Sequence, residues 1–437
     1  MKRSIDDELK KWQERKERKV LLLRGARQIG KTYSIRKLAE SFAYFLEVNF
    51  EENPHLCSFF KDSLNPLEIN ERLSFYFNIP IKPGQTLVFF DEIQACPEAL
   101  RSLRFYYEKM PALHVAAAGS LLEFALSEIP SFGVGRIESM YMYPMTFFEF
   151  LEASGSGMLN EAIKAASVAN PMDPVIHNKI LERLKIFLVI GGMPRVVNTY
   201  IHEQNLAACQ VELDNLLNSL YDDFAKYKTK VPVLRLQETF KSVVYQTGNK
   251  FKYTSIQEGV DTHPYKDALE LLVRAGLVYK VFHSSASGLP LGGQITLKKF
   301  KTLVFDTGIF QRVQGLDISE HIISDFSALV NRGNLCELFT GLELIAGQIP
   351  RLRPEIYYWH REARASNAEV DYVISHHGQV IPIEVKSGLK GQMQSLYLFL
   401  EEKKLPLGLR VSSENFTAYD KIKTIPLYAI PRIYHLS

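Results

Sequence analysis

A glycine-rich segment near the N-terminus constrains this chain more than any other feature. The segment matches the pattern G-x-x-x-x-G-K-[ST] and consists of Gly25, Ala26, Arg27, Gln28, Ile29, Gly30, Lys31 and Thr32. The apolar run at 20–23 before it predicts a buried parallel strand, and the run at 33–40 after it predicts a helix. Between a strand and a helix, this pattern predicts a phosphate-binding loop; a chance match on an ordinary βα loop is the alternative.

Four residues carry the chemistry expected of this loop. Gly25 and Gly30 allow the backbone to curl, so that its N–H groups face phosphate oxygens beside the N-terminus of the helix. Lys31 is expected to reach the β- and γ-phosphates, and the Thr32 hydroxyl is expected to bind Mg²⁺. The loop therefore predicts ATP and Mg²⁺ as cofactors.

Two acids at the end of a second apolar run support this prediction. The run at 86–90 predicts another buried strand, and Asp91 and Glu92 follow it directly. In a phosphate-loop ATPase the first acid at such a strand end holds Mg²⁺, usually through water, and the second orients and deprotonates the attacking water. A strand ending in Asp-Glu is a weak signal alone, but downstream of the phosphate loop it assigns these roles to Asp91 and Glu92.

A third apolar run, at 113–118, ends next to Ser120. A polar side chain at this strand end would point to the γ-phosphate region, so Ser120 is a candidate sensor. It also begins a Ser-x-x-Glu capping box with Glu123, and both roles can hold together. With a further strand expected at 45–50, the alternation of strands and helices predicts a doubly wound parallel sheet with the nucleotide at the carboxyl ends of the strands.

Composition limits the remaining classes. The length of 437 residues suggests two or three domains, and the net charge of +3 is too small to indicate a nucleic-acid partner by itself. The absence of any apolar run of about 18 residues argues against a membrane-spanning transport ATPase. The N-terminus has no signal-peptide core, and we expect a cytoplasmic protein. The cysteines are far apart without a CxxC pair, which also favours a reducing compartment; they are Cys57, Cys96, Cys209 and Cys336.

Several motifs in this order resemble a large family of bacterial and archaeal AAA+ ATPases whose C-terminal region is catalogued as a domain of unknown function. The motifs are GARQIGKT at 25–32, VFFDEIQ at 88–94, AAAGS at 116–120, Gly135-Arg136, YPMTFFEF at 143–150 and GGMPR at 191–195. The resemblance covers most of the chain and implies Mg-dependent ATP hydrolysis. In AAA+ proteins an arginine of the same or a neighbouring subunit often contacts the γ-phosphate, so the resemblance implies Arg136 or Arg195 for this role. A surface ion pair is the alternative for each.

The middle of the chain has a helical pattern. Apolar residues at mixed three- and four-residue spacing predict helices at 213–227 and 233–245. Two shorter helices, a turn and the strand at 277–282 then resemble a winged helix, which implies a DNA-binding element. Because its second helix is not strongly basic, we expect it to pack between domains or contact a protein, and DNA reading by this helix is the alternative.

Two strands near the C-terminus bring together residues with catalytic chemistry. The runs at 369–374 and 380–386 predict a hairpin with a turn between them. Residues two apart in a strand share a face, so Glu384 and Lys386 point the same way and Asp371 can meet them. Two carboxylates and a lysine could bind a divalent ion and activate water.

The spacing of Asp371, twelve residues, then Glu384-x-Lys386 resembles the PD-(D/E)xK nuclease superfamily. This resemblance implies a further glutamate from a preceding helix, and Glu337 matches best, with Glu343 as the runner-up. Glu337, Asp371 and Glu384 would then be metal ligands. The chain departs from the pattern because no proline precedes Asp371, and a hairpin with a surface Glu–Lys pair is the alternative.

These observations lead to one expected architecture and two functions. We expect an α/β chain with an AAA+ parallel-sheet core at 1–155, a helical lid and winged-helix-like region at 156–285, and an α/β nuclease-like domain at 286–437. The first function is an ATPase that couples its nucleotide state to a nuclease-like, DNA-binding C-terminal domain. The second is a nucleotide-gated signalling or protein-binding switch with a catalytically inactive scaffold. ATP, DNA, a protein and a second copy of the chain are the candidate partners; a membrane is not.

Overall fold

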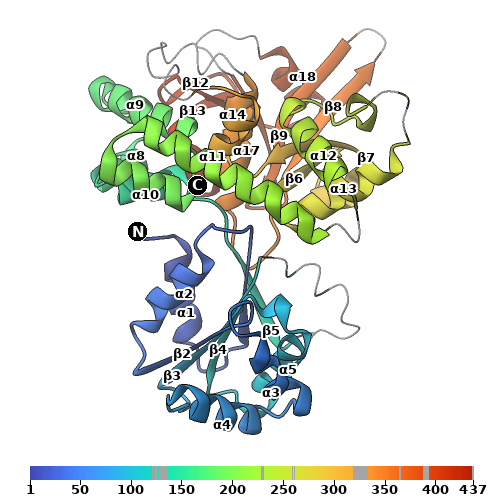
Figure 1. The fold of residues 1–437 in the computed structure, drawn as a ribbon. Coiled ribbons are helices and arrows are strands. Elements are labelled where there is room, and N and C mark those ends of the chain that lie inside the picture. Colours follow the sequence, from blue (N-terminus) through green and yellow to red (C-terminus); the bar gives the residue numbers. More distant parts are fainter. Residues whose placement is uncertain are drawn as a thin grey trace. The chain divides into compact units, whose positions relative to one another are not determined.

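The computed structural model (Figure 1) describes the residues 1–120, 122, 126, 135–227, 231–257, 259, 261–317, 333–363, 366–386 and 393–435. The chain forms two compact units. The first contains Met1–Tyr143 and Ile349–Arg353, and the second contains Pro144–Gln348 and Pro354–Ser437. The first unit thus ends before the expected boundary at 155, and the expected middle and C-terminal regions lie in one unit.

A five-stranded parallel sheet forms the centre of the first unit, in the order β2-β3-β4-β1-β5. The strands are β1 (Val20–Arg24), β2 (Tyr44–Asn49), β3 (Thr86–Asp91), β4 (His114–Ala118) and β5 (Ile137–Tyr141). The helices are α1 (Ile5–Gln13), α2 (Lys31–Ala39), η1 (Pro54–Cys57), α3 (Ser58–Asp62), α4 (Pro66–Phe77), η2 (Ile93–Ala95) and α5 (Pro97–Lys109). This arrangement confirms the predicted α/β class and the parallel sheet.

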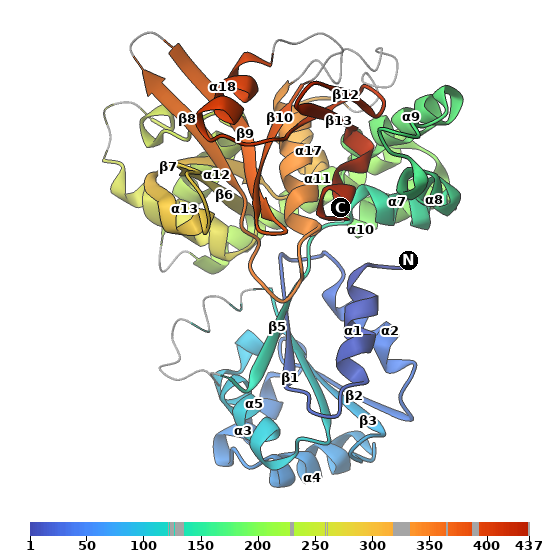
Figure 2. The same ribbon diagram turned by 180° about the vertical axis from the view of Figure 1, so that it is seen from behind.

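Helices cover both faces of this sheet, because the strand side chains that point to either face are apolar. Leu22, Val88 and Phe90 belong to a buried cluster with the side chains of α3, α4 and α5. Leu21 and Phe89, on the opposite face, are also fully buried, and α2 packs against β3 and β4 there. Figure 2 shows α1 and α2 on one side of the sheet and α5 on the other. Near-continuous apolar strands are the pattern expected for a doubly covered parallel sheet.

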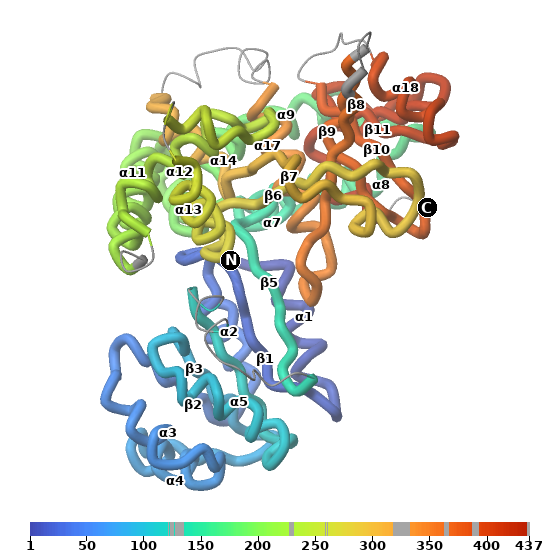
Figure 3. The backbone as a smooth tube through the Cα atoms, turned by 90° about the vertical axis from the view of Figure 1, so that its right-hand side faces the viewer, coloured from blue at the N-terminus to red at the C-terminus, as the bar shows by residue number. Residues whose placement is uncertain are grey.

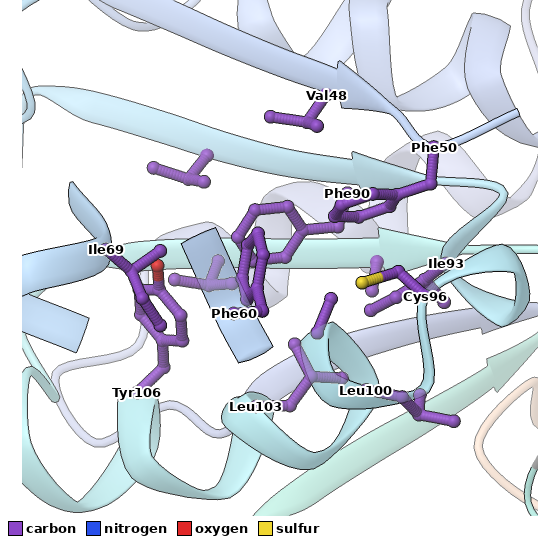
Figure 4. Close-up of a cluster of buried hydrophobic side chains, with 14 of the residues drawn as sticks. Val48, Phe50, Phe60, Ile69, Phe90, Ile93, Cys96, Leu100, Leu103 and Tyr106 are labelled. Atoms are coloured by element: carbon purple, nitrogen blue, oxygen red, sulfur yellow. The ribbon is translucent and has the colours of Figure 1, made fainter. Parts of the chain in front are cut away.

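Aromatic rings fill much of the cluster beneath α3 to α5 (Figure 4). Phe60 packs edge-to-face on both Phe50 and Phe90, with ring centroids 5.5 Å apart in each pair. Phe90 also meets Tyr106 at 5.7 Å. Each such pair adds about 0.5–1.5 kcal/mol beyond the burial of its apolar area. This packing holds β3 in place, and with it the acids at the end of that strand.

The second unit contains a mixed eight-stranded sheet in the order β12-β13-β11-β10-β9-β8-β6-β7. Its strands are β6 (Val278–Ser284), β7 (Ile295–Val304), β8 (Tyr357–Ala363), β9 (Ser366–His376), β10 (Gln379–Val385), β11 (Gly408–Ser412), β12 (Thr417–Tyr419) and β13 (Ile422–Pro426). The β6–β7 pair is antiparallel, and β6 joins β8 in a parallel pair. The strand expected in the middle region and the strands expected in the C-terminal region therefore belong to one sheet.

The helices of the second unit lie on both sides of this sheet. They are α7 (Phe147–Ala153), α8 (Gly157–Ala165), α9 (Pro174–Ile190), α10 (Pro194–Glu203), α11 (Leu206–Asp223), η3 (Phe224–Tyr227), α12 (Val233–Tyr245), η4 (Tyr253–Ser255), α13 (His263–Arg274), η5 (Leu291–Gln294), α14 (Thr307–Val313), α17 (Gly333–Ala346), α18 (Gln394–Glu402) and η6 (Leu427–His435). Helix α18 buries Leu396 and Phe399 against Trp359 and Val370. On the other face, the hydroxyl of Tyr372 donates to the carbonyl of Glu337 in α17.

Helices α12 and α13 precede the β6–β7 pair and lie beside it in Figure 3. This order is the one expected of a winged helix. The parallel pairing of β6 with β8 extends the pair into the larger sheet. The winged-helix interpretation stays a prediction. In the part of the chain that the structure describes, none of the helices has the length and apolar character needed to span a bilayer.

Candidate functional site

The predicted phosphate loop connects the end of β1 to the start of α2. Gly25 has a φ of 141°, and Gly30, which precedes the first residue of α2, has a φ of 96°. A Cβ atom at Gly25 would lie 2.2 Å from the carbonyl oxygen of Met142, so a side chain there cannot be accommodated without moving the backbone. Both positions require glycine for backbone reasons. The curl predicted for a phosphate-binding loop is therefore built into this segment.

Lys31 is folded back onto its own loop. Its Nζ donates to the carbonyl oxygens of Gly25 at 3.0 Å and Ala26 at 2.7 Å. Burial lowers the pKa of Lys31 to about 8, although the charges of Glu92 and Asp91 oppose this shift. A buried ammonium whose hydrogen bonds go to neutral carbonyls favours an anion in their place, and a triphosphate supplies one.

The Thr32 side chain meets the first acid of β3. The Thr32 hydroxyl donates to the Asp91 carboxylate at 2.8 Å, and Asp91 is only 4% exposed. Burial raises the pKa of Asp91, and the hydrogen bond from Thr32 opposes that rise. A hydroxyl and a carboxylate at this separation are hard oxygen donors of the kind that Mg²⁺ accepts beside a nucleotide. The two residues therefore fit the predicted Mg²⁺ site.

Glu92 follows in a left-handed backbone conformation, with a φ of 46° and a ψ of 43°. Gln94 donates its side-chain amide to the Glu92 carboxylate at 2.6 Å. The backbone N–H and hydroxyl of Ser120 also donate to this carboxylate, each at a longer 3.4 Å. The structure thus brings the predicted base and the predicted sensor together; the capping partner predicted for Ser120, Glu123, lies outside the described residues.

Gln94 is a residue of this site to which we assigned no role from the sequence. Its other amide atom, Oε1, is buried without a hydrogen-bond partner among the described residues. A Cβ atom at Gly119 would lie 2.0 Å from this oxygen, so the glycine makes room for the amide. Gln94 lies two residues after Glu92 within the motif VFFDEIQ, and that spacing was the only signal for it in the sequence.

The two candidate arginines form ion pairs in this structure. Arg136 pairs with Glu108 at 2.5 Å. It precedes β5, whose first residue is in register with Val20, at the start of β1. The phosphate loop follows the opposite end of β1, so Arg136 lies far from the loop of its own chain. Arg195, in the second unit, is 66% exposed and pairs with Glu212 at 2.5 Å.

The GGMPR motif makes a backbone contact in the second unit. Gly191 has a φ of 74°, and the N–H of Gly192 donates to Asp306 at 2.7 Å. Asp306 also caps α14 by accepting from the N–H of Ile309 at 2.9 Å. Burial raises the pKa of Asp306 to about 6, against the effect of these hydrogen bonds. The motif therefore joins α9 and α14 through a buried carboxylate.

Asp371 lies on β9, Glu384 lies on β10, and Lys386 directly follows that strand. Asp371 accepts a hydrogen bond from the backbone N–H of Val385 at 2.8 Å. Lys386 donates to Glu384 at 2.7 Å. Tyr357 pairs with Val373 and Trp359 with Val370, so β9 has one extra residue there. A bulge of this kind changes the face to which the following side chains point, and Asp371 and Tyr372 lie within it.

A buried lysine that the sequence did not single out lies between the acids. Lys301 Nζ is 2.8 Å from Glu337, 2.5 Å from Glu369 and 3.7 Å from Asp371, and the Lys301 side chain is 1% exposed. Burial opposes the charge of Lys301, but the surrounding carboxylates outweigh this and raise its pKa. Burial also raises the pKa of Glu337 to about 8. Because Lys301 lies in a run of lysines on β7, the segment around it has the composition of a solvent-exposed face.

The runner-up, Glu343, has a different environment. It is buried and accepts from the backbone N–H of Phe147 at 2.9 Å, at the start of α7. Burial raises the pKa of Glu343 to about 8. Within the described residues, no group of three or more His, Cys, Asp or Glu side chains is arranged to hold a metal ion. The metal site that the nuclease resemblance implies for Glu337, Asp371 and Glu384 stays a prediction.

Comparison with protein families assigns the first unit most clearly. Residues 17–151 match a family described as an AAA domain. Residues 181–321 and 332–430 match two domains of unknown function, DUF8612 and DUF4143. The AAA match supports an ATP-binding phosphate-loop ATPase domain at 17–151. The other two descriptions state no activity, so the nuclease-like interpretation stays a prediction.

Comparison with whole proteins gives distant similarities. No curated protein sequence matches the chain. Among solved structures, the Walker-type ATPase PABY2304 of Pyrococcus abyssi is 14% identical with a TM-score of 0.45, covering 71% of this chain and 94% of that one. A point variant of RuvB from Thermotoga maritima is 16% identical with a TM-score of 0.26, covering 63% and 88%. Unliganded Pif1 from Bacteroides sp. is 14% identical with a TM-score of 0.20, covering 39% and 47%.

Proposed function

We propose that the chain binds Mg-ATP at the loop 25–32 and hydrolyses it. One observation carries this proposal: the hydrogen bond between Thr32 and Asp91 joins the phosphate loop to the end of β3. The Glu92 carboxylate follows directly in the chain, and the Lys31 ammonium is buried in the same loop. Together these residues supply the parts that phosphoryl transfer to water requires, namely a phosphate cradle, a metal site and a base.

Each residue has a distinct part in this reaction. The loop N–H groups and Lys31 bind the phosphates, and Lys31 must leave the carbonyls of Gly25 and Ala26 to do so. Thr32 and Asp91 would hold Mg²⁺, which would supply charge stabilisation for the transferred phosphoryl group. Glu92 orients the attacking water and accepts its proton. Gln94 and Ser120 donate to Oε2 of Glu92, so the other carboxylate oxygen would be the one that accepts the hydrogen bond from water.

The test is ATP binding and phosphate release by Lys31→Ala. The variant should lose nucleotide binding or turnover, because the loop then lacks the ammonium that contacts the β- and γ-phosphates. Lys61→Ala, on the exposed surface of α3, is the matched control and should behave as the wild type. Full ATPase activity in Lys31→Ala would refute the proposal.

A segment of the chain suggests how nucleotide state reaches the second unit. Residues Ile349–Arg353, here called the arm, belong to the first unit although their neighbours in sequence are α17 and β8. The carbonyl of Pro350 accepts from the N–H of Tyr141 in β5 at 2.7 Å. Arg351 pairs with Glu8 at 2.8 Å and Glu138 at 3.0 Å.

The strand that binds the arm also touches the phosphate loop. The N–H of Met142 donates to the carbonyl of Arg24 at 2.9 Å, and the Met142 carbonyl packs against Gly25. Adjacent residues 141 and 142 thus connect the arm on one side and the phosphate loop on the other. We infer that movement of the loop during turnover is transmitted through the arm to α17 and β8.

Hydrogen–deuterium exchange tests this coupling. In the wild type, a non-hydrolysable ATP analogue should change exchange in α17 and β8, and Arg351→Ala should reduce that change while leaving ATP binding intact. Leu352→Ala is the control, because this neighbouring arm side chain is 66% exposed. Unchanged exchange in the wild type on adding the analogue would exclude the coupling.

A second candidate function is a nucleotide-gated switch whose second unit is a catalytically inactive scaffold for DNA or a protein. The position of Lys301 among the carboxylates favours it over an active nuclease. Plasmid and linear DNA incubated with Mg²⁺ or Mn²⁺ separate the two. Cleavage that Lys386→Ala abolishes would establish the nuclease, whereas no cleavage, or cleavage insensitive to this change, favours the switch.

A further inference from the structure

We propose that the ammonium group of Lys301 permanently occupies the place that a divalent cation would take in the nuclease-like fold. The Lys301 cluster, defined as Lys301, Glu337, Glu369 and Asp371, would then be a metal-free structural core. This inference concerns the second unit alone and does not depend on ATP hydrolysis by the first. It decides between the two candidate functions, because metal-dependent cleavage needs a cation at these carboxylates.

The distances place the ammonium where carboxylate oxygens converge. Lys301 Nζ lies 2.8 Å from Glu337 Oε1 and 2.5 Å from Glu369 Oε1, with Asp371 Oδ1 at 3.7 Å. Glu337 comes from α17, whereas Glu369 and Asp371 come from β9. Three carboxylates from two elements around one cation form the arrangement that a metal site would have, with nitrogen in place of the metal.

An aromatic ring covers a further side of the Lys301 ammonium group. Lys301 Nζ lies 5.4 Å from the centroid of the Tyr358 ring, which is itself buried. A ring face attracts an ammonium but supplies no lone pair to a hard divalent cation, which prefers oxygen ligands. The surroundings of Nζ are therefore suited to the lysine rather than to Mg²⁺ or Mn²⁺.

The backbone of Lys301 is held on both sides. Lys301 lies within β7 and pairs with Val281 of β6. On its other side it forms an isolated antiparallel bridge with Lys250, and the adjacent Phe251 donates its N–H to the carbonyl of Phe300. Removing the ammonium from the cluster would break backbone pairing or leave a buried charge without a partner, and both are costly.

A second cation cannot share these oxygens. Divalent cations bind carboxylate oxygens at about 2.0–2.6 Å, so a metal on Glu337 and Glu369 would lie within a few ångströms of Nζ. Two cations this close in a buried site repel each other strongly. The lysine expected to act on water is also engaged, since Lys386 donates to Glu384 at 2.7 Å. Neither part of the predicted nuclease site is arranged for metal-dependent chemistry.

The test is Mn²⁺ binding to the full chain without nucleotide, measured by electron paramagnetic resonance of free Mn²⁺. Asp91→Asn serves as the background in every sample, so that the first unit contributes no metal site. Lys301→Met removes the ammonium and keeps the length of the side chain, while Lys301→Arg keeps the charge. Adding Asp371→Asn shows whether any bound Mn²⁺ lies in the Lys301 cluster.

We expect no stoichiometric Mn²⁺ binding with Lys301 or with Lys301→Arg. Lys301→Met should bind Mn²⁺ at least about tenfold more tightly than the chain with Lys301, and adding Asp371→Asn should remove that site. Failure of a folded Lys301→Met chain to gain this site would overturn the proposal. So would Mn²⁺ binding by the chain with Lys301 intact that Asp371→Asn abolishes. If Lys301→Met does not fold, as judged by circular dichroism, this last measurement alone decides.

Discussion

The hydroxyl of Thr32, in the first turn of α2, donates a 2.8 Å hydrogen bond to Asp91 at the end of β3. This contact joins two motifs that are 59 residues apart in the sequence. It places two hard oxygen donors side by side at the carboxyl end of the sheet. Because of this pair, we expect ATP binding at this site to depend on a divalent cation.

Thr32→Val should remove the contribution of Mg²⁺ to ATP binding. The variant retains the shape of the side chain but loses the hydroxyl, so affinity for ATP with Mg²⁺ should fall by about tenfold or more, approaching the affinity measured in EDTA. Thr32→Ser should remain close to the wild type. Titrating a fluorescent ATP analogue with and without Mg²⁺ measures both, and an unchanged response to Mg²⁺ in Thr32→Val would contradict the assignment.

Glu92→Gln should bind ATP but turn it over slowly. The amide keeps the size of the side chain but accepts no proton, so the hydrolysis rate should fall by roughly 10²–10⁴-fold. Phosphate release under saturating ATP gives the rate, and equilibrium binding gives the affinity. Loss of binding together with turnover would show instead that Glu92 mainly stabilises the loop.

ATP affinity should depend on pH through Lys31. Burial lowers the pKa of Lys31 to about 8 in the nucleotide-free protein, whereas phosphates favour the charged ammonium. Below pH 8 the proton is already present; above it, binding must take up a proton, so affinity should fall by up to about tenfold per pH unit. Equilibrium binding at pH 7, 8 and 9 measures this dependence.

Lys31→Arg provides the control for that titration. Its guanidinium stays protonated throughout this range, so the variant's affinity, whatever its absolute value, should not fall between pH 7 and 9. A wild-type affinity that is equally independent of pH would show that Lys31 is already protonated at pH 9 in the free protein.

Stability of the second unit should fall with rising pH because of Glu343. Burial raises the pKa of Glu343 from 4.5 to about 8, so the folded state holds a proton that the unfolded state releases in this window. The stabilising contribution is fully present below about pH 4.5 and is lost as the pH rises to about 8. Relative to Glu343→Gln, the wild type should lose about 2–4 kcal/mol of unfolding free energy between pH 5 and 8.

Urea unfolding at several pH values measures this difference. Comparison with the glutamine variant isolates Glu343 from other buried acids, because those titrate equally in both proteins. Glutamine can still accept the hydrogen bond from Phe147, so the start of α7 keeps its partner. Parallel pH profiles for the two proteins would mean that Glu343 is ionised in the folded state.

Local patterns predicted the elements of the first unit closely. The expected strands at 45–50, 86–90 and 113–118 are β2, β3 and β4, with shifts of a residue or so at their ends. The phosphate loop, with the strand before it and the helix after it, also lies as predicted. These features depend on residues adjacent in sequence, since glycine conformation, apolar runs and the pattern G-x-x-x-x-G-K-[ST] act over short distances.

Other contacts could not be anticipated in this way. Arg136 and the phosphate loop lie at opposite ends of β1 and β5, because the register of two parallel strands is a property of the assembled sheet. The pairing of β6 with β8 joined two expected regions into one sheet. Neither relationship leaves a signal within a single segment of the chain.

The amino-acid sequence by itself determined the phosphate loop, its two acids and the α/β class, because these arise from local backbone geometry and apolar periodicity. It also determined that Asp371 and Glu384 would lie on neighbouring strands, since a short turn between them leaves little other choice. Only the tertiary structure decided what surrounds them. Lys301 lies 70 residues before Asp371 in the chain, and its charge reaches the carboxylates only after β7, α17 and β9 pack together. Lys301 belongs to a run of lysines that looks solvent-exposed in the sequence, but packing buries it as the cation of an acidic cluster.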